Sequence, residues 1–148
     1  IPAYYTARSP FRTDAPTMRG QDARHDALFS HVSLEQRVRD MTRLTARLST
    51  GLSGRDLTVF LRGSLSAPGW FLLDSGNLDL LVVAPHLSGG GAVDAVNQVA
   101  FTVDGLTPQT IDARTKALVI DGAIPESFMR QYVWTFDLAA SAVWARPY

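Results

Sequence analysis

After Gly54, apolar and polar residues alternate in short runs that are separated by Gly, Pro, Asn and Asp. A period of two is typical of β-strands with one buried face, and the separating residues favour turns. The pattern therefore predicts a compact and mainly β region. The expected strands are Leu57–Arg62, Trp70–Asp74, Leu78–Ala84, Val99–Val103, Thr110–Ile111, Ala117–Ile120, Tyr132–Asp137 and Val143–Arg146.

A helical spacing precedes this β region. Apolar residues recur there every three or four positions, which predicts one amphipathic helix over about residues 33–50. Ser33 and Gln36 have the spacing of a capping box at its start, and Gly51 is suited to its end. The apolar stripe consists of Leu34, Val38, Met41, Leu44 and Leu48.

Two further segments complete the expected organisation. Residues 1–31 are rich in Pro, Arg, Asp and Thr without a sustained period, which indicates an extended arm. A short helix is expected over Glu126–Gln131, with Pro125 at its first helical position. The chain is thus divided into an arm with a helix (residues 1–56) and a mainly β domain (residues 57–148).

The composition narrows the possible chemistry. The chain has 148 residues, no cysteine, three histidines at scattered spacings, and 14 basic against 14 acidic side chains. These values argue against thiol chemistry, disulfides and His- or Cys-based metal sites, so no metal or cofactor is expected. A net charge of zero argues against nucleic-acid binding. Because no apolar run approaches the roughly 20 residues of a membrane-spanning helix, no membrane partner is expected either.

The cellular compartment stays open. A chain without cysteine is compatible with oxidising and with reducing surroundings.

The most informative stretch is the string from Trp70 to Val83. An apolar strand ends in Asp74, Ser75 and Gly76 form a tight turn, and a second apolar strand begins after Asn77. A carboxylate at the end of a buried strand lies against the core, where it needs hydrogen bonds or a bound proton. Asp74 is either a turn cap or a functional acid.

This arrangement resembles the opening of a retropepsin-like aspartic protease, in which two strands lead into Asp-Thr/Ser-Gly. A second match spans residues 119–138, which are similar to the family's hydrophobic-hydrophobic-Gly element, short helix and closing strand. Residues 99–118 are similar to the hairpin before that element. The resemblance covers residues 57–146 in the family's order. It implies a closed β domain with one short C-terminal helix and aspartic endopeptidase activity.

The resemblance also implies roles for individual residues. Asp74 is the expected catalytic residue, within an active-site loop of Ser75, Gly76 and Asn77. Ser75 would donate a hydrogen bond across a two-fold axis, and Gly76 would let the backbone approach the reacting water. Since the chain holds one Asp-Ser-Gly, a homodimer acting on a peptide or protein substrate is expected. The candidate tip of a substrate-covering flap is the run Gly89, Gly90 and Gly91.

Two other functions remain open. Asn77 stands where the family usually has Ala or Ser, Pro125 stands where it usually has Gly, and the interval that would hold the flap is short. These departures favour an inactive dimerisation or peptide-binding module. Alternatively, Gly63-Ser64 followed by Asn77 and Asp79 is similar to the Gly-Ser and Asp-x-Asp elements of nucleotidyltransferases. Those enzymes need two carboxylates for Mg²⁺.

The other strand-associated acids are expected to be structural. Strand alternation places Asp79 toward solvent or in a salt bridge, Asp121 in a turn, and Asp137 at the end of a strand.

Overall fold

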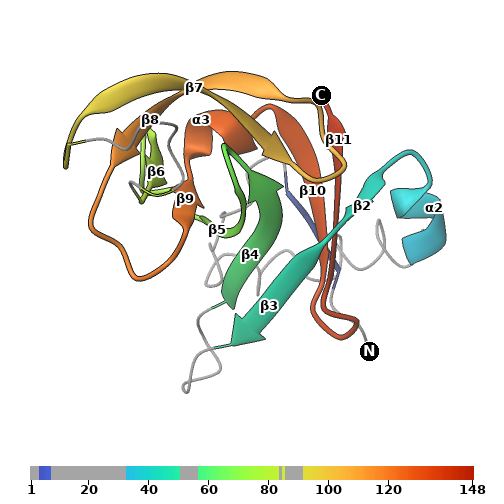
Figure 1. Cartoon of the computed structure of the whole chain (residues 1–148). Helices are drawn as coiled ribbons and strands as arrows, with labels where there is room; N and C mark the ends of the chain where they lie inside the picture. Colours follow the sequence, from blue (N-terminus) through green and yellow to red (C-terminus); the bar gives the residue numbers. More distant parts are fainter. Residues whose placement is uncertain (1–3, 8–32, 51–56, 84, 86–91) are drawn as a thin grey trace.

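The computed structural model describes residues 4–7, 33–50, 57–83, 85 and 92–148, and this part of the chain is mainly β (Figure 1). Its helices are α2 (Leu34–Val38) and α3 (Glu126–Met129). Its strands are β1 (Tyr4–Ala7), β2 (Thr42–Leu44), β3 (Ala46–Thr50), β4 (Leu57–Ser64), β5 (Pro68–Leu73), β6 (Leu80–Val82), β7 (Val96–Val103), β8 (Gln109–Thr115), β9 (Gly122–Ile124), β10 (Tyr132–Asp137) and β11 (Ala142–Pro147).

A closed β-barrel forms the larger part of the fold. Seven strands pair in the order β3-β4-β5-β9-β6-β8-β7, and a further pairing of β4 with β7 closes the sheet. Closure depends on a glycine, because a Cβ on Gly63 would lie 2.6 Å from the carbonyl oxygen of Thr102. Backbones that approach this closely leave no room for a side chain. The expected mainly β, closed architecture is thus confirmed.

A second sheet of four strands packs beside the barrel in the order β1-β10-β11-β2. β2 pairs with β11, whereas β3, which follows after Thr45, pairs with β4 of the barrel. In Figure 1 these two strands run almost end to end and so join the sheets. A boundary at residue 56 therefore separates two strands, β3 and β4, that are hydrogen-bonded neighbours.

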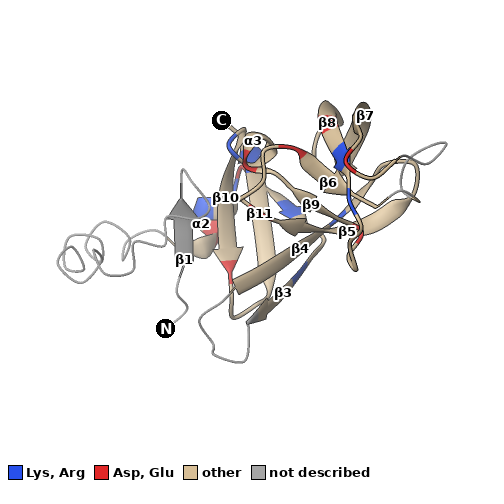
Figure 2. Cartoon of the chain, turned by 90° about the vertical axis from the view of Figure 1, so that its left-hand side faces the viewer, with Lys and Arg blue, Asp and Glu red and all other residues tan. Residues whose placement is uncertain are grey.

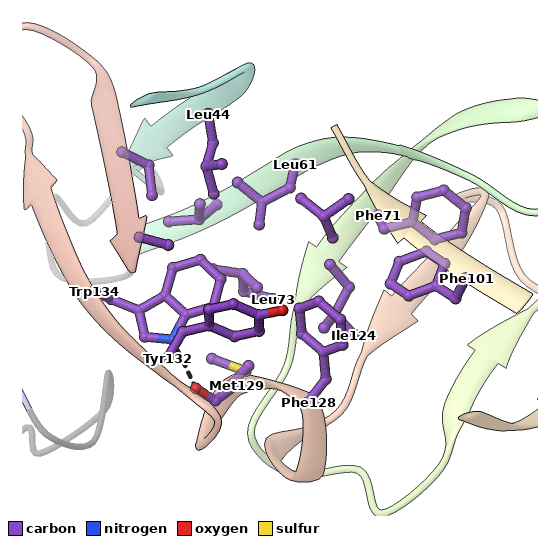
Figure 3. Packing of buried hydrophobic residues seen from close by; sticks show 14 of the residues in the cluster. Leu44, Leu61, Phe71, Leu73, Phe101, Ile124, Phe128, Met129, Tyr132 and Trp134 are labelled. Carbon is purple, nitrogen blue, oxygen red and sulfur yellow. Dashed lines mark hydrogen bonds between the residues drawn. The ribbon is translucent and has the colours of Figure 1, made fainter. Parts of the chain in front are cut away.

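The core between the sheets contains a continuous chain of aromatic rings. Neighbouring centroids lie 5.0 to 6.3 Å apart, within the range of favourable ring pairs. The polar atoms of these rings have partners. The Trp134 Nε1–H donates to the Met129 carbonyl at 2.7 Å (Figure 3), and the Tyr132 hydroxyl accepts from Gln109 Nε2 at 2.8 Å. This packing anchors α3 against the barrel. The rings belong, in order, to Phe71, Phe101, Phe128, Tyr132, Trp134 and Phe136.

The predicted helix over residues 33–50 is wrong beyond its first turns. The capping box of Ser33 and Gln36 is present, but α2 ends at Val38, and β2 and β3 follow. Leu44 and Leu48 fit both a helical and a strand period, since four residues are also two strand repeats. Pairing with β11 and β4 selects the strand, in which Leu44 is buried.

Two smaller predictions also need correction. No strand forms over Ala117–Ile120. The strand lies at β9 instead, and Val119 is fully exposed. The short helix is present as α3, but Pro125 is its N-cap with extended backbone (φ −79°, ψ 165°) and not its first helical residue.

Candidate functional site

The loop from Asp74 to Leu78 follows β5 at one end of the barrel. β5 runs parallel to β9, with Leu73 opposite Ile124, and the Asp74 N–H continues the ladder by donating to the Ile124 carbonyl at 3.0 Å. The chain is therefore still extended at Asp74. Alternation then directs its side chain away from the core face that carries Leu73. The Asp74 side chain is half-buried in this position.

Both carboxylate oxygens of Asp74 accept hydrogen bonds from the same loop. Oδ1 accepts from the Gly76 N–H at 2.9 Å, and Oδ2 accepts from the Asn77 side-chain amide at 2.5 Å. A Cβ on Gly76 would lie 3.2 Å from Oδ1, so glycine gives the backbone close access to the carboxylate. The loop thus fixes the orientation of the acid with two uncharged donors.

α3 holds the other side of this loop. The Glu126 N–H donates to the Asn77 carbonyl at 3.3 Å, and the Ser127 hydroxyl donates to the Leu78 carbonyl at 3.2 Å. Pro125 is buried and has no N–H, and its carbonyl accepts from the first turn of α3. Proline therefore fits at the junction of β9 and α3. Leu78 itself is 85% exposed, so an apolar side chain projects from the loop next to the acid.

The Asp74 carboxylate has no basic partner in the described part of the chain. The described ion pairs involve other acids, of which Asp79 with Arg114 is the nearest along the chain, at 2.9 Å. No second carboxylate is hydrogen-bonded to Asp74 there either. In the described residues, its hydrogen bonds therefore come from uncharged donors alone.

Three other acids, for which the sequence predicted structural roles, accept hydrogen bonds within the fold. Asp79 accepts from Nε and Nη2 of Arg114, and Figure 2 shows acidic and basic residues side by side near β6 and β8. Asp121 accepts from the Trp70 N–H at 2.7 Å. Asp137 ends β10, where it is buried and accepts from the Ala140 N–H.

The other candidate residues are placed less fully. Ser75 is exposed at the tip of the loop. The run Gly89, Gly90 and Gly91, proposed as a flap, lies outside the described residues, as do the three histidines. Within the described ranges, no cluster of three or more acids or histidines could hold a metal ion. None of the helices there is long and apolar enough to cross a bilayer.

Sequence reasoning found Asp74 but missed the contribution of Asn77 to its setting. Asparagine at this position looked like a departure from the protease pattern, yet its amide supplies the donor on Oδ2. The available signal was the spacing of three residues within a tight turn, where the side chains of Asn and Asp commonly form local hydrogen bonds.

Comparison with protein-family models, curated proteins and solved structures gives no match for this chain.

Proposed function

We propose that this chain is an aspartic endopeptidase that works as a homodimer. The observation that carries the proposal is the Asp74 carboxylate. It is half-buried at the end of a barrel strand, and neutral donors on both oxygens orient it without a basic partner among the described residues.

The reaction needs a second carboxylate, and the described part of the chain brings none to Asp74. A second copy of the chain supplies one when two Asp74 loops meet at a two-fold axis. Two carboxylates about 3 Å apart cannot both ionise at low cost, so the pair holds one proton. The exposed Leu78 beside each loop provides apolar surface for this contact.

The dyad acts on a water molecule bound between the two acids. The ionised carboxylate removes a proton from the water, and the water oxygen attacks the carbonyl carbon of the peptide. The protonated carboxyl donates a hydrogen bond to the carbonyl oxygen. The proton taken from water then passes to the leaving nitrogen as the C–N bond breaks. The Gly76 N–H already donates to Asp74 Oδ1, and the resemblance assigns the Ser75 hydroxyl to a hydrogen bond across the two-fold axis.

The test is cleavage of a peptide library between about pH 3 and 7, analysed by mass spectrometry. Asp74→Asn keeps the size of the side chain but removes the acid, and cleavage should fall by about 100- to 10,000-fold. Asp79→Asn is the matched control, since this acid lies five residues away and pairs with Arg114. The Asp79→Asn variant should retain the cleavage activity. An active-site inhibitor of aspartic proteases should abolish the cleavage by this variant and by the wild-type chain. Unchanged cleavage by Asp74→Asn would reject the proposal.

An inactive peptide-binding module is the alternative that the same preparation tests. A dimer that binds peptides but cleaves none over the whole pH range would favour it. The nucleotidyltransferase alternative has less support, because the one formal Mg²⁺ ligand, Asp79, is engaged by Arg114. Mg²⁺-dependent nucleotide binding in a calorimeter would be needed to revive it.

A further inference from the structure

Two arginines flank one tryptophan on the outer face of strands β3, β4 and β5. The guanidinium carbon of Arg47 lies 4.0 Å from the centroid of the Trp70 ring, and that of Arg62 lies 5.6 Å from it. Arg62 stands directly opposite Trp70 in the β4–β5 ladder. Arg47 reaches the same ring from β3, across β4. These three side chains are called the arginine–tryptophan face below.

The described residues leave this face with more positive than negative charge, since two arginines stand beside one neighbouring carboxylate, that of Asp121. Neither Arg47 nor Arg62 forms an ion pair within the described ranges. The carboxylate of Asp121 accepts a hydrogen bond from the neutral Trp70 N–H at 2.7 Å. On the same side of these strands the register also places uncharged residues, namely Ser49, Thr58, Phe60, Ser64, Pro68 and Leu72.

The geometry prepares the two guanidinium groups for anions. A guanidinium that packs on an aromatic ring keeps its edge N–H groups free for a carboxylate, and the contact limits its rotamers. A ligand then loses less conformational entropy when it binds. Stacking of nucleic-acid bases on Trp70 is disfavoured, because guanidinium groups already cover the ring.

The arginine–tryptophan face lies on the same side of β5 as the candidate catalytic acid. Trp70, Leu72 and Asp74 alternate with the buried Phe71 and Leu73, and the ladder continues to Asp74. Four residues of extended chain span about 13 Å, which an extended peptide covers with about four residues of its own. A peptide that passes Asp74 can therefore reach Arg62 and Arg47 over the half-buried Leu72.

We propose that the arginine–tryptophan face binds an acidic, extended peptide segment. In the endopeptidase proposed above, on which this second part rests, the segment belongs to the substrate and lies about four residues from the cleaved bond. The face then acts as a specificity site. It selects acidic substrates by ground-state binding, while the Asp74 dyad performs the chemistry.

The first experiment measures binding without cleavage. The Asp74→Asn chain is titrated at pH 7 and low salt into two fluorescein-labelled decapeptides. The peptides are identical except at two positions, which hold glutamate in one peptide and glutamine in the other. The glutamate peptide should bind about ten-fold more tightly. Arg47→Gln and Arg62→Gln should each reduce this preference about three-fold, and Arg47→Lys should restore part of it.

Arg43→Gln is the matched control. The guanidinium carbon of Arg43 lies 5.7 Å from the centroid of the Trp144 ring, so Arg43 makes the same kind of contact on the other sheet. Its substitution by glutamine removes the same charge. It should leave the preference unchanged. Equal binding of the two peptides, or an equal loss in Arg43→Gln, would overturn the inference in favour of nonspecific attraction. Tighter binding of single-stranded DNA than of the glutamate peptide would also overturn it. Thermal unfolding confirms that each variant is folded.

The second experiment separates this inference from the proposed function. With the wild-type chain, glutamate about four residues from the cleaved bond should lower KM several-fold and leave kcat unchanged. Cleavage without such a preference would reject the specificity site and support the proposed protease activity. Preferential binding of the glutamate peptide without any cleavage keeps the binding face and removes the protease.

Discussion

The loop around Asp74 and the charged region around Asp79 lie close together in the sequence but treat their carboxylates differently. In the first region both oxygens of Asp74 accept from uncharged donors, Gly76 and Asn77. In the second, Arg114 binds Asp79 through two nitrogens. Asp79, which precedes β6, is therefore paired with a cation on β8, whereas Asp74 has no basic partner in the described residues.

The two carboxylates therefore differ in the kind of group that holds them. Half-exposed ion pairs such as Asp79 with Arg114 contribute little to stability. The Asp74 carboxylate is oriented instead by two uncharged donors of its own loop. Substitutions that exchange these properties test the contrast.

The largest expected effect comes from the strand that supports both regions. Gly122 in β9 lies between Phe71 and β6, and a Cβ there would be 2.3 Å from the Leu81 carbonyl oxygen. Gly122→Ala should lower the free energy of unfolding by about 3 kcal/mol or more, since backbone must move. Urea denaturation measures this loss.

Gly76→Ala is the control for this substitution. Its Cβ would meet only the Asp74 Oδ1 at 3.2 Å. We expect a much smaller loss of stability and a lower rate of peptide cleavage. An equally stable Gly122→Ala variant would contradict the close packing of β9.

The next effect concerns the amide that holds Asp74. Asn77→Ala removes the donor on Oδ2, and hydrogen bonds to charged groups contribute about 1.5–3 kcal/mol. If the bond orients the acid in the transition state, kcat should fall roughly 10- to 100-fold with little change in KM. Asn77→Ser, which keeps a hydroxyl donor, should retain more activity. A rise in KM alone would show that Asn77 contributes to binding instead.

A smaller effect is expected in the ion-paired region. Arg114→Gln breaks the pair with Asp79, whose side chain is 26% exposed against 37% for Arg114. The free energy of unfolding should decrease by less than about 1 kcal/mol, because solvent screens such pairs. Added salt should shrink the difference between variant and wild type. A loss of several kcal/mol would mean that Asp79 is more than a surface partner.

The smallest effect is a dependence of stability on pH. Hydrogen bonding and the charge of Lys116 hold the pKa of Asp94 below its ordinary value. The pair therefore stabilises the fold above about pH 4 and loses this contribution as pH falls through the lower pKa of the folded state. In Asp94→Asn the slope of stability against pH below about 4 should be slightly shallower. A steeper slope in the variant would reverse the assignment.

The sequence predicted those parts of the molecule whose signals are local. β10 follows from a run of aromatic and β-branched residues that ends in Asp137, and the capping box follows from Ser33 and Gln36, three positions apart. The Asp74 turn is local as well, so the candidate acid could be found without a structure.

The errors come from partners that are distant in the sequence. Residues 42–50 have a spacing that suits a helix, but their strand partners are Val143 on β11 and Leu61 on β4, which no short window includes. The strand expected at Ala117–Ile120 has the stronger β-forming residues. β9 forms instead because Gly122 admits the backbone of β6, which is a steric property of the assembled barrel.

The most direct test of the shared dyad mixes active and inactive subunits. Wild-type and Asp74→Asn chains are unfolded together in equal amounts and refolded, and cleavage is compared with that of the same total amount of refolded wild type. If each site needs Asp74 from two copies, only dimers of two wild-type chains cleave, and about one quarter of the activity remains. If one chain carries a complete site, about one half remains, and that result would contradict the account.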